Sequence, residues 1–172
     1  MLHEDQPAHP WGTVTPAFWA APEPAGPPAV TPDFADRFAE LTGLLDRTSD
    51  TDVLAAVAAK AGVLDQDVTA ALGPTDPNVA NVRELRGLIA RRQGRRTEAA
   101  RWHLHTAGLH IATGGVGSPR ARASAKHALS DWREIPDPAE RTAVGHEILP
   151  VLAAVAGTDA PPTWEVKAYL TG

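Results

Sequence analysis

Residues 82–108, VRELRGLIARRQGRRTEAARWHLHTAG, decide the fold class of this chain. Apolar residues recur at helical spacing on both sides of Gly94, so the stretch predicts two short helices, 78–92 and 98–112, joined at this glycine. Helices this short are marginal in water by themselves and must bury their apolar faces against other helices. The stretch therefore predicts a helical hairpin within an all-α domain.

Six residues of this hairpin form a pattern of small, turn and aromatic positions. They are a glycine in the first helix, a Gln-Gly turn, a Glu-Ala pair that opens the second helix, and an aromatic residue: Gly87, Gln93, Gly94, Glu98, Ala99 and Trp102. Residues 82–108 therefore resemble one tetratricopeptide repeat, which implies a hairpin in which small residues let the two backbones approach. Arg86 and Ala90 depart from the pattern, and no second copy follows at the repeat's interval of about 34 residues.

Residues 57–72, VAAKAGVLDQDVTAAL, resemble a helix-turn-helix. The matching positions are a small residue, the turn glycine with an apolar neighbour, and two apolar contacts: Ala58, Gly62, Val63, Val68 and Leu72. The pattern predicts that one helix, 53–61, stops at Gly62 and that a second, 66–72, follows it. A helix that reads DNA needs basic or amide side chains, but this one opens with Asp65 and Asp67 and contains no base, so we do not expect it to bind DNA.

Apolar periodicity and turn residues predict further helices at 33–47, 120–134, 139–156 and 164–170. We expect Pro150 to kink or split the third of these. The predicted architecture is an all-α domain of six to seven short helices, packed as hairpins over residues 33–156. A linker and a short docking helix follow at 157–172.

Residues 1–32 are predicted to form an extended arm, because eight prolines between Pro7 and Pro32 rule out a continuous helix. The arm also contains Trp11, Phe18 and Trp19, and large aromatic side chains gain from burial. Two interpretations remain open. Either residues 10–20 dock in a groove on this protein's own helices or on a symmetry mate, or they form a linear motif that docks on another protein.

The net charge of −5 is distributed unevenly along the chain. Residues 1–80 carry a balance of −9, whereas residues 81–172 carry +4, and residues 81–126 hold ten basic residues against two acidic ones. This asymmetry has two interpretations. The basic face pairs with the acidic half of the same chain, or it docks an acidic partner or nucleic acid.

The arginines at the hairpin turn, Arg92, Arg95 and Arg96, are the first candidates for a binding site, because guanidinium groups bind carboxylates and phosphates bidentately. The remaining candidates are aromatic and histidine side chains of the second hairpin helix and of the arm: Trp102, His103, Trp11, Phe18 and Trp19. We expect a non-enzymatic adaptor or regulatory subunit that binds another protein with an acidic surface. The alternative is a nucleic-acid-binding regulator that uses the arginines of residues 83–101, and a homo-oligomer also remains open.

No motif predicts catalysis, a cofactor or a metal site. The chain has no cysteine, which excludes disulfides, thiol catalysis and cysteine-ligated zinc. Its histidines lack the i,i+4 spacing of a helical metal site, and the loop 113–119, TGGVGSP, lacks the Gly-Lys-Ser/Thr of a phosphate-binding loop. The absence of a leader pattern and of a long apolar run predicts a cytoplasmic protein with no membrane contact.

Overall fold

The computed structural model describes residues 34–172, so the predicted arm with Trp11, Phe18 and Trp19 lies outside the described residues. Helices make up 83% of the described part, and it contains no strand, which confirms the all-α prediction. Seven helices occur there: α2 (Phe34–Arg47), α3 (Thr51–Leu72), α4 (Pro77–Arg92), α5 (Arg96–Gly114), α6 (Pro119–Arg133), α7 (Pro138–Ala156) and α8 (Pro161–Thr171).

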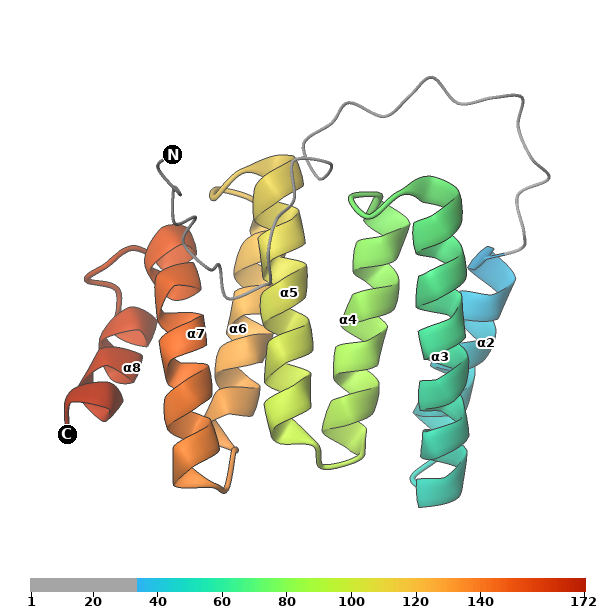
Figure 1. Ribbon diagram of the computed structural model, residues 1–172, viewed down its shortest axis with the longest axis horizontal. Coiled ribbons are helices and arrows are strands. Elements are labelled where there is room, and N and C mark those ends of the chain that lie inside the picture. The colour runs from blue at the N-terminus through green and yellow to red at the C-terminus, as the bar shows by residue number, and fades with distance from the viewer. Residues whose placement is uncertain (1–33) are drawn as a thin grey trace, which may run out of the picture. The chain divides into compact units, whose positions relative to one another are not determined.

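Each helix packs against the next one in the chain, as in a series of helical hairpins. The helices follow one another along the long axis of the domain, from α2 and α3 at one end to α8 at the other (Figure 1). Further contacts join α2 to α4 and α5 to α7. None of the helices within residues 34–172 is long and apolar enough to cross a membrane.

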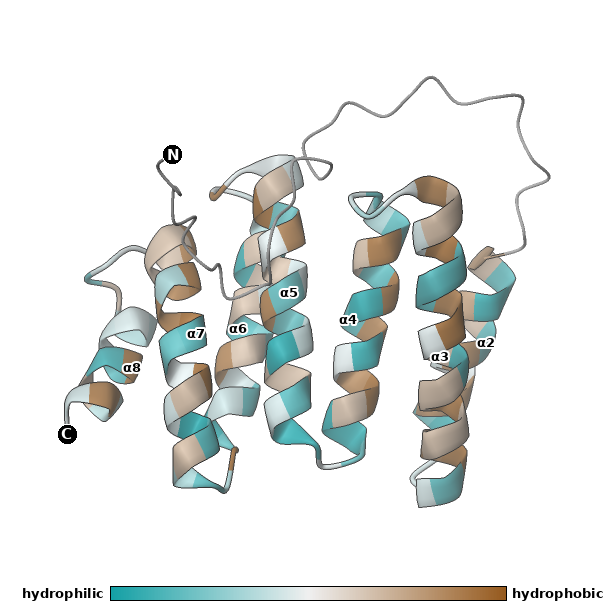
Figure 2. Ribbon diagram, viewed as in Figure 1, coloured by the Kyte–Doolittle hydropathy of each residue, from teal (hydrophilic) through white to brown (hydrophobic). Residues whose placement is uncertain are grey.

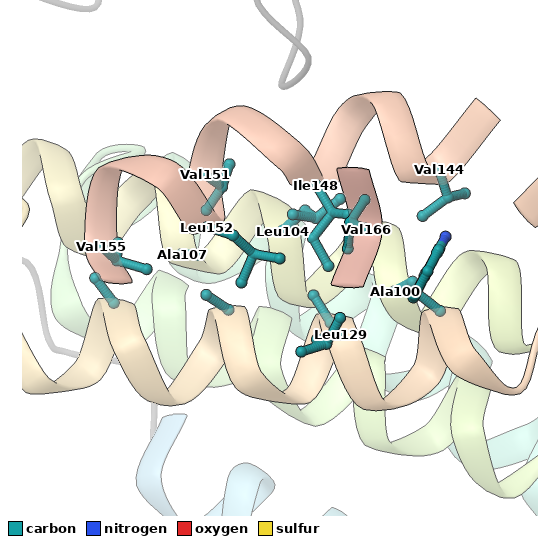
Figure 3. Close-up of a cluster of buried hydrophobic side chains, with 14 of the residues drawn as sticks. Ala100, Leu104, Ala107, Leu129, Val144, Ile148, Val151, Leu152, Val155 and Val166 are labelled. Atoms are coloured by element: carbon teal, nitrogen blue, oxygen red, sulfur yellow. The ribbon is translucent and has the colours of Figure 1, made fainter. Parts of the chain in front are cut away.

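The apolar side chains form two separate cores. The first core joins α2, α3 and the face of α4 that carries Val79, Val82, Leu85 and Ile89. In the second core, Ile148 and Leu152 of α7 lie among side chains of α5, α6 and α8, including Leu104, Leu129 and Val166 (Figure 3). Hydrophilic residues are frequent on α4 and in the first half of α5, between the more hydrophobic α3 and α7 (Figure 2). The two cores thus meet across a region that is rich in polar side chains.

The connections that follow α3, α5 and α7 are three copies of one turn. Each starts with a glycine at positive φ whose amide donates to the carbonyl four residues earlier: Gly73, Gly115 and Gly157. Four residues after each glycine, a proline occupies the first turn of the next helix: Pro77, Pro119 and Pro161. Both sets recur at intervals of 42 residues. The sequence analysis missed this repeat, and its period is nearer the roughly 40–47 residues of HEAT-type helical repeats than the roughly 34 of tetratricopeptide repeats.

The predicted helix-turn-helix is wrong, because α3 runs without a break from Thr51 to Leu72. Its buried stripe continues through Gly62, with Ala61 before it and Leu64 after it, so burial outweighs the low helix propensity of one glycine. Asp65, which was expected at the opening of a second helix, is instead buried within α3. Pro150 likewise lies inside α7, which is not split.

Gly87 and Gly62 provide a matched pair of substitutions within helices. A Cβ atom at Gly87 would lie 2.7 Å from Cε1 of His103, whereas a Cβ atom at Gly62 meets no atom within 4 Å. We expect Gly87→Ala to lower the free energy of unfolding by about 1–3 kcal/mol through overpacking. Gly62→Ala is expected to raise it by about 0.5–1 kcal/mol, because alanine favours a helix. Urea unfolding followed by circular dichroism measures both changes, and a destabilising Gly62→Ala would contradict the continuous α3.

Candidate functional site

A network of charged and polar side chains fills the space between the two cores. It is built from α3, α4, α5 and α6, and we call it the polar network: Asp65, Arg83, Glu84, Arg86, Arg91, Arg96, His103, His105, His110, Ser124 and Asp131. Helix α4 positions it, because one face of this helix enters the first core while Arg83, Glu84 and Arg91 point the other way.

Asp131 of α6 is the most buried charge of the network, with 0% of its side chain exposed. Arg91 of α4 binds its carboxylate with two hydrogen bonds, from Nε at 2.7 Å and from Nη2 at 2.9 Å. Arg96, at the start of α5, donates a third hydrogen bond from Nη1 at 3.1 Å. One carboxylate therefore ties three helices together through charge-assisted bonds, the strongest kind available to side chains.

Asp65 of α3 also binds two arginines through its carboxylate, on the other side of α4 from Asp131. Its carboxylate accepts hydrogen bonds from Arg83 Nε at 3.0 Å and from Arg86 Nη1 at 2.6 Å. The guanidinium of Arg86 also stacks on the ring of Trp102, 3.8 Å from its centroid, which is a cation–π contact. Trp102 thus covers an arginine of its own chain, and both side chains are partly buried.

Glu84 links α4 to the helices beyond it. Its Oε1 accepts a hydrogen bond from Ser124 Oγ at 2.8 Å and lies 3.2 Å from Nε2 of the buried His110. The contacts Glu84–Ser124 and Arg91–Asp131 have the same sequence offset of 40 residues. Because the offset is constant, α4 and α6 run parallel and side by side.

His103 is fully buried, and neither of its ring nitrogens has a hydrogen-bond partner among the described residues. Nε2 lies 3.6 Å from Oδ2 of Asp131, and the ring meets that of His127 edge-on with centroids 5.2 Å apart. Burial lowers the pKa of His103 to about 4 despite the nearby carboxylate of Asp131. Burial and the charge of Arg83 likewise lower the pKa of His105 to about 4, and its neutral Nε2 lies 2.6 Å from Nη1 of Arg83.

The structure does not bring the predicted site residues together on one exposed surface. Arg92 is exposed, and Arg95 is exposed but pairs with Glu98 of its own turn. Arg96 is occupied by Asp131 and Glu134, and His103 lies in the interior, where a partner cannot touch it. The basic stretch therefore pairs largely within the chain, with carboxylates from both the acidic first half and the second half.

Five exposed cations have no hydrogen bond or ion pair from their side chains within residues 34–172. One of them, Arg47, ends α2, and the other four belong to later helices. These four lie at the end of α4 and on α6, where Arg122 and Lys126 share one side of the helix and Arg120 lies on another. We call the four residues together the basic face: Arg92, Arg120, Arg122 and Lys126. The sequence analysis missed the three on α6. A signal was present, because no Asp or Glu occurs between Glu98 and Asp131.

The carboxylates of the network are all engaged by other side chains of the chain. Each is bonded to arginine, histidine or serine, and no group of three His, Asp or Glu side chains within the described range could hold a metal ion. The geometry of the network fixes how α3, α4, α5 and α6 pack. The residues of the basic face take no part in this packing through side-chain hydrogen bonds or ion pairs within the described residues.

Asp131→Asn tests the part that the buried carboxylate plays. We expect a loss of about 2–4 kcal/mol in the free energy of unfolding, because Arg91 loses its counter-charge and Arg96 keeps only Glu134, though each arginine has about a quarter of its side chain in solvent. Glu98→Gln is the control: it removes an exposed partner of Arg95 and is expected to change stability by no more than about 0.5 kcal/mol. Urea unfolding measures both variants, and equal losses would contradict a special role of Asp131.

The two neutral histidines predict an acid-sensitive fold. Their pKa values are about 4 in the folded chain against 6.5 for a free histidine, so the unfolded chain binds more protons at intermediate pH. The free energy of unfolding is therefore highest above pH 6.5 and falls as the pH drops towards 4, by at most about 1.4 kcal/mol per pH unit for each histidine.

Urea unfolding at pH 7, 6 and 5 measures this dependence on pH. His103→Gln should reduce the slope whatever its effect on absolute stability, whereas His146→Gln, at an exposed position of α7, serves as the control and should leave the slope unchanged. An unaltered slope in His103→Gln would show that this residue is not a source of the acid sensitivity.

No model of a known protein family matches the chain, and a comparison with curated proteins finds no match either.

Proposed function

We propose that this protein is a non-enzymatic adaptor or regulatory subunit that binds an acidic surface of another protein through the basic face. The observation that supports this most directly is the division of the basic residues into two groups. Arg83, Arg86 and Arg91 are occupied by buried or nearly buried carboxylates, whereas the basic face is exposed and without a counter-charge within residues 34–172. Exposed, unpaired cations attract an acidic partner over the range of a Debye length.

The setting of the basic face favours a protein partner over nucleic acid. Leu88 is 39% exposed and stands one helical turn before Arg92 on α4, so the same face offers an apolar contact next to a cation. Binding to nucleic acid through residues 83–101 would need a row of free arginines, but all of these arginines except Arg92 are paired within the chain.

We also infer that the α4–α5 hairpin is a tetratricopeptide-like unit. The close approach of Gly87 to His103 and the positive φ of Gly94 are what the resemblance implies for a helix-packing glycine and a turn glycine. The 42-residue spacing of the turns is the main departure, since each helix pair is longer than in that repeat. A stack of such hairpins presents a continuous surface of successive helices, which suits an adaptor.

A triple charge reversal tests the basic face. The variant combines Arg120→Glu, Arg122→Glu and Lys126→Glu. It should bind a fluorescent glutamate-rich peptide at least tenfold more weakly. Its melting temperature should change little, because exposed charges contribute little to stability. The matched control is Arg47→Glu, Lys60→Glu and Lys167→Glu, which changes the net charge equally at exposed positions outside this face. Fluorescence anisotropy at two salt concentrations measures binding.

The outcomes separate the alternatives. Selective loss in the first triple variant supports the adaptor proposal. Equal loss in both variants would mean that only net charge matters and would contradict it. Tighter, steeply salt-dependent binding of duplex DNA or RNA than of the peptide, abolished by the first variant, would assign the basic face to nucleic acid instead.

A further inference from the structure

An apolar groove is lined by residues of α2, α3 and α4, the helices nearest the start of the described range. Its walls are aromatic and aliphatic, with two asparagines along one side: Phe34, Ala35, Phe38, Val68, Asn78 and Asn81. Phe34 and Phe38 are only partly buried although they pack on the first core. The groove therefore leaves apolar surface of the core open to an occupant.

The dimensions and chemistry of the groove suit an aromatic side chain of an extended peptide. Its volume is about 220 Å³, below the roughly 300–1,000 Å³ of small-molecule sites. No titratable side chain lines it, which gives it no means of acid–base chemistry. The side-chain amide of Asn81 makes no hydrogen bond to any residue of the described range, so it is free to pair with a peptide backbone at the rim.

The part of the chain that precedes the described residues supplies a matching occupant. The described range begins at Phe34, which itself lines the groove, and the residues before it include the adjacent pair Phe18 and Trp19. Aromatic anchors that enter apolar pockets carry much of the energy of an interface. Burial of one such side chain contributes on the order of 1.5–3 kcal/mol.

Residues 20–33 connect the Phe18–Trp19 pair to the groove-lining Phe34, and their composition indicates whether the pair binds the groove of its own copy or that of another. Residues 20–33 contain five prolines: Pro22, Pro24, Pro27, Pro28 and Pro32. Each proline ring restricts φ to near −65° and favours extended chain, a form that rises about 3.1 Å per residue. A sequence of this composition disfavours the sharp reversal that would return the pair to the groove of its own copy. A groove on a second molecule requires no reversal.

We propose that the groove binds the Phe18–Trp19 pair of a second copy of this chain, and that two copies exchange these segments reciprocally. Each copy contributes one such segment and this groove. In a two-fold symmetric dimer both grooves are therefore filled, and no further copy is needed. This inference is independent of the basic face, which lies on α4 and α6. The test therefore bears on the exchange alone.

Cysteine cross-linking tests the contact directly, since the natural chain has no cysteine. One preparation carries Ala20→Cys and the other carries Asn78→Cys. When the two are mixed and mildly oxidised, we expect a covalent dimer. Digestion of this dimer should release peptides that are joined by a disulfide between residues 20 and 78. Ala143→Cys, at an exposed position of α7, replaces Asn78→Cys as the control and should not be joined. No preference over this control would overturn the proposal. A link formed only within single chains of the double variant would also overturn it.

Light scattering provides a second, independent measurement. The natural chain should have twice the 18.1 kDa mass of a single copy. The observed mass should be halved by the double substitution Phe18→Ala and Trp19→Ala, which removes the occupant of the groove. Ala35→Trp should have the same effect, because it fills the groove from an exposed position. Ala143→Trp is the matched control and should leave the mass unchanged. A single-copy mass for the natural chain at every concentration, with all variants folded by circular dichroism, would overturn the exchange.

Discussion

The buried carboxylate of Asp131 is the constraint on which the middle of this molecule depends. It belongs to α6, yet its hydrogen bonds come from Arg91 at the end of α4 and Arg96 at the start of α5. The α4–α5 turn is thus held against the following helix at both of its ends. Because a buried charge is costly without its partners, the packing of these three helices has one arrangement that satisfies all three groups.

The polar network replaces hydrophobic contact where the two cores meet, and this has a consequence for stability. Buried ion pairs contribute less to stability than apolar packing of equal volume, but they penalise any shift that breaks them. Helices rich in alanine can slide or rotate against one another with little loss of contact, so such a penalty is useful here. Fixed bonds at Asp65, Glu84 and Asp131 set the register of α4 against α3, α5 and α6.

The sequence predicted the positions of most helices, because apolar periodicity and glycine or proline turns are local signals. It failed at Gly62, where a single glycine was interpreted as a turn although the buried stripe of α3 continues past it. It also missed that the turns at Gly73, Gly115 and Gly157 repeat every 42 residues, because it considered a repeat of about 34 residues. A search for glycine followed four residues later by proline would have found them.

The binding residues were harder to predict, because a sequence does not show which arginine meets which carboxylate. Arg91 and Arg92 are neighbours with identical side chains, but α4 turns one towards Asp131 and the other into solvent. The difference depends on a residue 40 positions away, which no local pattern reveals. In contrast, the absence of any acid between Glu98 and Asp131 is visible in the sequence. Clusters of arginines also arise where a protein neutralises its own buried carboxylates, so clustering alone does not identify a binding site. A stronger candidate is a cation that has no acidic residue near it in the sequence and contacts none in the folded structure.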